Sequence, residues 1–191
     1  MTFNSKNTVL ASVPKILTFA FLALSVQSLA QAQSGAFHAG TLIPEYGKIA
    51  DIADMVPLAK DANYNISFDV SKQAEVGELN RQFVSSARFL NMHVANGVDP
   101  ENINLAIVIH GKAVLDVTKQ EFYEDKTVAD NANAGLIAKL VENGVEVFVC
   151  GQSAAFQGVK TSDLLPGVKM SLSAMTAHAT LQQSGYTYNP F

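Results

Sequence analysis

The chain has 191 residues with 13 basic and 17 acidic side chains, and it contains a single cysteine. Lys6 and Lys15 are the only charged residues among the first 32, so eleven basic residues stand against all 17 acidic ones in the remainder, a net charge of −6. This balance predicts no basic surface for nucleic acid or anionic lipid, and one cysteine excludes an internal disulfide.

The first 32 residues have the pattern of a secretory signal peptide. The apolar run at residues 16–30 follows the two lysines and ends at Ala30-Gln31-Ala32, a small-x-small cleavage site. The run is about 14 residues long, shorter than the roughly 20 that a membrane-spanning helix needs, although an uncleaved anchor is the competing interpretation. We expect cleavage after Ala32, or alternatively after Ala30. The mature protein would then be periplasmic or secreted, with no membrane attachment.

The first half of the remaining chain moves from an irregular lead-in to regular elements. Residues 33–63 have no clear hydrophobic period, whereas Tyr64–Val70 alternates apolar and polar side chains as a strand does. A polar loop follows. One helical face is then predicted from the spacing of Leu79, Phe83, Ala87, Leu90 and Val94, ending at Asn96-Gly97.

The second half alternates apolar runs with helical patterns. Asn102–His110 predicts a strand buried on both faces. The later elements expected are a helix from about Asn131 ended by Asn143-Gly144, a strand at Val145–Val149, a helical turn at Ser153–Gly158, a strand at Val168–Leu172, a helix at Thr176–Ser184 and a short strand at Tyr186–Tyr188.

Strands that alternate with helices indicate an α/β fold in one domain over residues 64–191. Each right-handed crossover lays a helix on one face, so the pattern predicts a mostly parallel sheet covered on both faces. The pattern leaves the order of the strands in the sheet open.

Candidate site residues follow the ends of the predicted strands. In an open parallel sheet, ligands bind beyond the carboxyl ends of the strands. His110-Gly111 and Cys150-Gly151 each end a strand, and Ser173 follows a third. The glycines allow the backbone to turn and leave space above the side chains. We therefore expect His110 and Cys150 to share one rim of the sheet.

Two interpretations of Cys150 stay open at this point. As a reactive thiolate, it would gain from the helical turn that follows it, because backbone amides at a helix start lower a thiol pKa, and His110 would stabilise the charge. Alternatively, Cys150 is a small apolar residue that closes a strand, and His110 is a strand-end histidine bonded to a loop carbonyl.

Other chemistry has weaker support in the sequence. The segment Gly151-Gln-Ser153 followed by Asp163 and His178 has the chain order of a serine hydrolase triad, but His178 falls within a predicted helix, and Ser153 is more simply a helix N-cap. The four histidines have no metal-ligand spacing, and no phosphate-binding motif occurs, so we expect no metal and no cofactor.

Three segments carry a resemblance to a known family: IVIHGKAV (107–114), NANAGLIAKLVENGVEVFVCGQS (131–153) and LLPGVKMSLSAMTAHATLQQSGY (164–186). In these segments the chain resembles the DsrE/DsrF-like family of sulfur-relay proteins, and it is most similar to exported single-domain members. The resemblance implies a flavodoxin-like three-layer α/β/α fold with about five strands. It also implies homo-oligomers, as trimers or hexamers.

The resemblance further implies that Cys150 accepts sulfur as a persulfide and passes it on. The expected function is a periplasmic sulfur-handling protein, with a sulfur donor and an acceptor protein as partners. Residues that bind or assist would be His110, Gly111, Gly151, Gln152, Ser153 and Ser173. The alternative is a non-catalytic oligomeric binding module with a small-ligand pocket at the carboxyl ends of the strands. Well-known relay members are cytoplasmic and serve transfer-RNA modification, a substrate that an exported acidic protein does not meet.

Overall fold

The computed structural model describes residues 1–2, 35–59 and 61–190. The predicted signal peptide, apart from its first two residues, lies outside them. The regular elements are strands β1 (Tyr64–Val70), β2 (Ile103–Ile109), β3 (Glu146–Cys150), β4 (Val168–Ser171) and β5 (Thr187–Asn189), α-helices α2 (Arg81–Ala95), α3 (Gln120–Thr127), α4 (Asn133–Glu142), α5 (Gly151–Gln157) and α6 (Ala174–Gln183), and 3₁₀ segments Pro100–Asn102, Gly111–Val117 and Thr161–Asp163.

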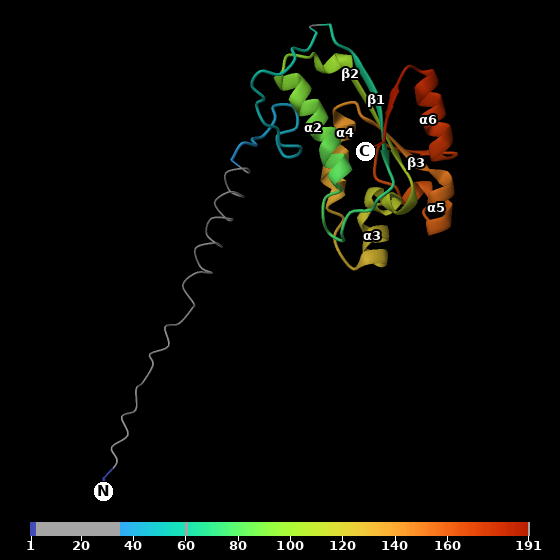
Figure 1. Cartoon of the computed structure of the whole chain (residues 1–191). Coiled ribbons are helices and arrows are strands. Elements are labelled where there is room, and N and C mark those ends of the chain that lie inside the picture. Colours follow the sequence, from blue (N-terminus) through green and yellow to red (C-terminus); the bar gives the residue numbers. More distant parts are fainter. Residues whose placement is uncertain (3–34, 60, 191) are drawn as a thin grey trace. The chain divides into compact units, whose positions relative to one another are not determined.

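The five strands form one sheet in the order β4-β3-β2-β1-β5, and every neighbouring pair is parallel. The chain thus moves outward from β1 to β4 and then returns to the other side of β1 to add β5. Helices cover both faces (Figure 1). The expected three-layer, flavodoxin-like α/β/α fold is confirmed, with the predicted number of strands.

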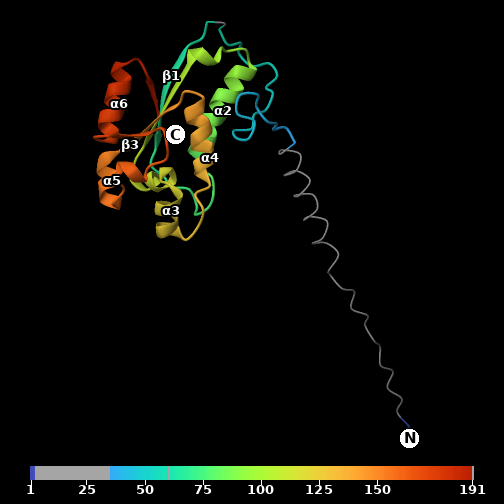
Figure 2. The same cartoon turned by 180° about the vertical axis from the view of Figure 1, so that it is seen from behind.

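The two faces of the sheet are covered differently. Helices α2 and α4 lie on one face and α6 on the other, as the two opposite views show (Figures 1 and 2). The α2/α4 face holds the large apolar core, which includes Phe68 and Ile107 from the strands and Leu140 from α4. The α6 face holds a small cluster of four buried residues, Ala106, Val108, Ala177 and Leu181. Residues alternate between the faces because successive side chains of a strand point to opposite sides.

The lead-in contributes to the core despite its lack of hydrophobic period. Ile43 is completely buried, and His38 pairs with Ile49 in an antiparallel bridge. The buried side chain of Asn91 in α2 accepts a hydrogen bond from the Ile43 amide and donates to the Ile43 and Tyr46 carbonyls. A buried amide side chain of this kind satisfies loop backbone groups that would otherwise lack partners.

Helix α3 was not expected from the sequence. Its eight residues, QEFYEDKT, bury only Tyr123 completely, so the segment lacks the repeated apolar face that predicts a helix. Predicted bounds of the other elements differ by a few residues, as is usual for helix and strand ends. Within the described part of the chain, no helix is both long and apolar enough to span a bilayer.

Candidate functional site

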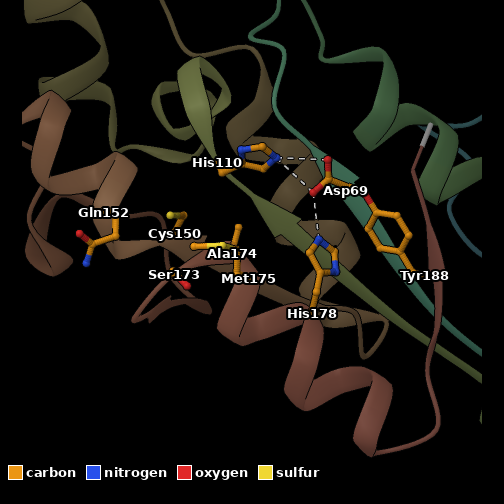
Figure 3. Close-up of a pocket in the computed structure, with 9 residues that line it drawn as sticks. All are labelled: Asp69, His110, Cys150, Gln152, Ser173, Ala174, Met175, His178 and Tyr188. Atoms are coloured by element: carbon orange, nitrogen blue, oxygen red, sulfur yellow. Dashed lines mark hydrogen bonds and ion pairs between the residues drawn. The ribbon is translucent and has the colours of Figure 1, made fainter.

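A pocket of about 390 Å³ lies at the carboxyl ends of the strands (Figure 3). Its wall combines the end of β1, β2 and β3 with the start of α6 and with β5. The lining residues are Asp69, His110, Cys150, Gln152, Ser173, Ala174, Met175, His178 and Tyr188. The parallel sheet brings His110 and Cys150 to this common rim, because β2 and β3 are neighbours with the same direction.

Cys150 ends β3 and is the N-cap residue of α5. The residue is 6% exposed, and it lines the pocket. Burial by itself raises the pKa of the thiol, but hydrogen bonds from the Ser153 hydroxyl and from the amides of Ser153, Ala174 and Gln152 outweigh it. The pKa of Cys150 therefore lies below its ordinary value, which favours the thiolate.

Ser153 connects the ends of β2 and β3. Its hydroxyl oxygen accepts a hydrogen bond from the Gly111 amide at 3.0 Å, which leaves the hydroxyl hydrogen for the sulfur of Cys150. The prediction that Ser153 is a helix N-cap is wrong, because α5 begins two residues earlier, at Gly151. The cap position belongs to Cys150, whose extended backbone directs the chain into the helix.

The two glycines of the rim have different roles. Gly111 adopts a φ of +54°, a left-handed conformation that favours glycine. At Gly151 a side-chain carbon would lie 2.7 Å from the Ser171 carbonyl oxygen, so a larger residue would push β4 away from β3. Gly151 thus allows the close approach that brings the start of α6, with the Ala174 amide, next to Cys150.

Asp69 joins two histidines in the same pocket. Its Oδ1 lies 3.1 Å from Nε2 of His110 and 2.9 Å from Nε2 of His178 (Figure 3). Nδ1 of His178 lies 2.8 Å from the hydroxyl of the completely buried Ser67. The ring of Tyr188 packs edge-on against His178, with centroids 4.8 Å apart. The pocket therefore has an apolar and amide-lined side at Cys150 and a titratable side at Asp69.

The remaining predicted residues support the walls. Ser173 is the N-cap of α6 and accepts a hydrogen bond from the Thr176 amide at 3.0 Å. The side chain of Gln152 donates to the Leu172 carbonyl at 3.3 Å. Both line the pocket, but the side chain of Ser173 is engaged in capping rather than free for a ligand.

Asp69, Ser67 and Tyr188 were not identified from the sequence. A signal was present for the first two, since Ser67 and Asp69 are polar residues two apart in a strand and so lie on one face of it. Tyr188 had no such signal, because only the return of β5 to the side of β1 brings it to the pocket.

The serine hydrolase interpretation is wrong. The carboxylate of Asp163 accepts hydrogen bonds from the Lys160 amide and the Ser162 hydroxyl in a local capping arrangement. His178 is instead bonded to Asp69 and Ser67. Ser153, Asp163 and His178 therefore do not form a triad. Among the described residues, no group of three or more histidine, cysteine or acidic side chains is arranged to hold a metal ion.

Comparison with known proteins gives a family and distant structural neighbours, among them two solved structures. One solved structure, the protein of unknown function MTH1491 from Methanobacterium thermoautotrophicum, is 19% identical, covers 68% of this chain and 100% of its own, and has a TM-score of 0.49. The ychN protein from E. coli is 17% identical, covers 67% of this chain and 99% of its own, and has a TM-score of 0.47. No curated protein sequence matches. The DsrE/DsrF-like family matches residues 66–190, well over half of the sequence, and the chain belongs to that family.

Proposed function

We propose that this chain is an exported sulfur-handling protein in which Cys150 carries sulfur as a persulfide. The DsrE/DsrF-like family is associated with sulfur relay. The observation that carries the proposal is the setting of Cys150, which lines a pocket and has its pKa lowered by four hydrogen bonds. A thiolate is the form that attacks a sulfur donor, and it is also the leaving group when an acceptor thiolate takes the outer sulfur from the persulfide.

The partners are a sulfur donor, an acceptor with a free thiol and further copies of this chain in a trimer or hexamer. The pattern of residues 1–32 supports export, which places the protein in the periplasm or outside the cell. The relay would then serve an acceptor other than the machinery of transfer-RNA modification. The lone thiol has no second cysteine of the same chain with which to form a disulfide in an oxidising compartment.

Intact-mass analysis tests this function directly. The purified protein is incubated with inorganic polysulfide, in wild-type form and as Cys150→Ser. We expect the wild type alone to gain the mass of one sulfur atom and to lose it on mild reduction. The mass of protein recovered from the exporting cell also shows whether residues 1–32 have been removed.

The control is alkylation with iodoacetamide before and after unfolding in urea. If the wild type gains no sulfur, and Cys150 reacts with iodoacetamide only after unfolding, the carrier function is contradicted. Cys150→Ser removes the only thiol with little change in volume, so any adduct that persists in this variant is unrelated to cysteine chemistry.

A second candidate function is a non-catalytic binding module. The 6% exposure of Cys150 favours it, because a sulfur carrier must present its sulfur to a partner. In this case the pocket would hold a small ligand between the titratable side at Asp69 and the amides around Cys150. Resistance of the native thiol to both reagents is the result that selects this function.

A further inference from the structure

A continuous chain of hydrogen bonds leads from the interior of the sheet to the pocket. Ser67 and Asp69 lie two residues apart on β1, on the face that α6 covers, and His178 of α6 lies between their polar groups. His110, at the end of the neighbouring strand β2, bonds to the other side of Asp69. The order is thus Ser67, His178, Asp69 and His110, and the last three line the pocket (Figure 3 shows these three).

Exposure increases steadily along the outer part of this chain. Ser67 is completely buried, and the side chains of His178, Asp69 and His110 are 13%, 19% and 34% exposed. The carboxylate is thus largely removed from water, which strengthens its hydrogen bonds to the two imidazoles. Asp69, His110 and His178 all line the pocket, and His110 is the most exposed of the three.

The donors and acceptors define where the protons lie. An ionised carboxylate only accepts, so both histidines direct an Nε2–H toward Asp69. His178 has its second nitrogen on Ser67. Nδ1 of His110 has no hydrogen-bond partner among the described residues, and in neutral His110 this nitrogen carries the basic lone pair. In Figure 3 the His110 ring lies between Asp69 and the part of the pocket that contains Cys150.

We propose that Asp69 is a positioning residue that holds His110 in this tautomer, braced by His178 and Ser67, and that His110 Nδ1 accepts and returns the proton of the sulfur transfer at Cys150. The inference rests on the proposed function and deepens it by naming the acid–base group and its support. A histidine oriented by a carboxylate is a common way to fix the proton on one nitrogen.

The other titratable groups around the cluster are few. Tyr188 of β5 faces His178, and Cys150 of β3 shares the pocket. Helices α5 and α6 bring no other charged side chain to the lining. Lys72 and Lys112, close in sequence to Asp69 and His110, line adjoining hollows instead. From α2, the side chain of Gln82 donates to the backbone carbonyl of Asp69.

The step balances with a persulfide donor, R–S–SH. Cys150 gives its proton to His110 Nδ1, and the thiolate attacks the outer sulfur of the donor. The new S–S bond forms at Cys150, the S–S bond of the donor breaks, and R–S⁻ leaves with the bonding pair and takes the proton from His110. The net change is Cys150–SH and R–S–SH to Cys150–S–SH and R–SH, with no external oxidant or reductant.

The test is the pH profile of sulfur uptake by Cys150 from glutathione persulfide, followed by intact mass between about pH 5 and pH 9, the window in which histidine and cysteine titrate. Asp69→Asn and His110→Gln are expected to slow uptake about a hundredfold or more at neutral pH and to remove the histidine inflection from the profile. Asp69→Glu should restore part of the rate and the inflection, because it restores the carboxylate.

A matched control is available in the same chain. His38 and Asp51 form an exposed pair at 3.3 Å outside the pocket, and Asp51→Asn should leave rate and profile unchanged. The urea midpoint of each variant shows whether it is folded. If Asp69→Asn does not fold, His178→Gln is tested in its place. A folded Asp69→Asn protein with the wild-type rate and profile overturns the inference.

Failure of the carrier function can be distinguished from failure of this inference. If the wild type accepts no sulfur but its native Cys150 still reacts with iodoacetamide, the roles of Asp69 and His110 are judged from the pH profile of that alkylation. A native thiol that reacts with neither reagent overturns the inference together with the carrier function. Loss of the histidine inflection in Asp69→Asn and His110→Gln then supports the roles of Asp69 and His110 without supporting the carrier function. An alkylation profile that is the same in both variants and the wild type overturns the inference.

Discussion

The two faces of the sheet use the same strands for different purposes. On the α2/α4 face, side chains such as Phe68, Ile107 and Leu140 are packed without exposure in one large cluster. On the α6 face, the same strands present Ser67, Asp69 and the small cluster around Leu181. The first face accounts for most of the burial, and the second carries the titratable groups.

The difference shows how a small domain separates stability from chemistry. The hydrophobic contribution scales with apolar area removed from water, so a large continuous core on one face stabilises the whole sheet. Polar side chains on the other face then lie on a rigid strand, because β1 and β2 are paired with each other and the core packs against their opposite face. Reactive groups on strand ends are positioned by a core in which they take no part.

The histidines illustrate the same contrast. His93, near the end of α2, packs against the rings of Phe89 and Tyr64 and bonds to the Phe89 carbonyl at 2.7 Å. Burial lowers its pKa, so it is held neutral. His178, on the other face, is bonded to a carboxylate and a hydroxyl. His93 is therefore part of the packing, and His178 is part of a hydrogen-bonded network of titratable side chains.

The largest expected effect is a difference in the free energy of unfolding lost when an apolar side chain is truncated on each face. Leu140→Ala, in the large cluster, should lower the free energy of unfolding by about 3–5 kcal/mol, and Leu181→Ala, in the small cluster, by about 2 kcal/mol, since the cost grows with the cavity that remains. Urea denaturation measures both. Equal losses in this matched pair would show that the α6 face contributes as much as the core.

A smaller expected effect is a change in the reactivity of the Cys150 thiol. Ser153→Ala removes a hydrogen bond that lowers the pKa of Cys150, so the pKa should rise. Iodoacetamide should react about fivefold more slowly at neutral pH, which corresponds to a hydrogen bond of about 1 kcal/mol, and the rate should recover at alkaline pH.

The matched control lies on the other side of the sheet. Ser86 of α2 is completely buried, and its hydroxyl donates to the Gln82 carbonyl. Ser86→Ala should leave the alkylation rate of Cys150 unchanged. A wild-type rate in Ser153→Ala, or a slower rate in Ser86→Ala, would contradict the role assigned to Ser153.

The smallest expected effect is a pH dependence that arises from the core face. Because burial lowers the pKa of His93 in the folded protein, the unfolded chain takes up a proton first as the pH falls through the ordinary value of 6.5. Stability should therefore decline below that pH until the folded pKa is reached, and then level off.

His93→Phe should flatten this decline, although it also removes the hydrogen bond to Phe89. The readout is thus the slope of the urea midpoint against pH rather than its absolute value. An unchanged slope between the wild type and the variant would mean that other groups cause the acid dependence.

Much of the architecture could be predicted because the signals are local. The alternation in Tyr64–Val70 and the apolar run of β2 indicate strands on their own, and the spacing from Phe83 to Leu90 indicates a helix. The rule that ligands bind at the carboxyl ends of parallel strands was sufficient to place His110 and Cys150 at one rim. Helix α3 escaped prediction because its apolar face is almost absent.

What the sequence by itself determined is therefore most of the elements (α3 is the exception), the α/β class and the candidate thiol, since hydrophobic periods of 2 and 3.6 residues need no distant partner. Only the tertiary structure decided the partners of Asp69, which lie 41 and 109 residues away in the chain. His110 meets Asp69 because β1 and β2 are parallel neighbours, and His178 meets it because α6 packs on the face of the sheet to which Asp69 points, an arrangement set by the packing of the whole domain. The strand order is a global property, and the hydrogen-bonded chain of Ser67, His178, Asp69 and His110 is its consequence.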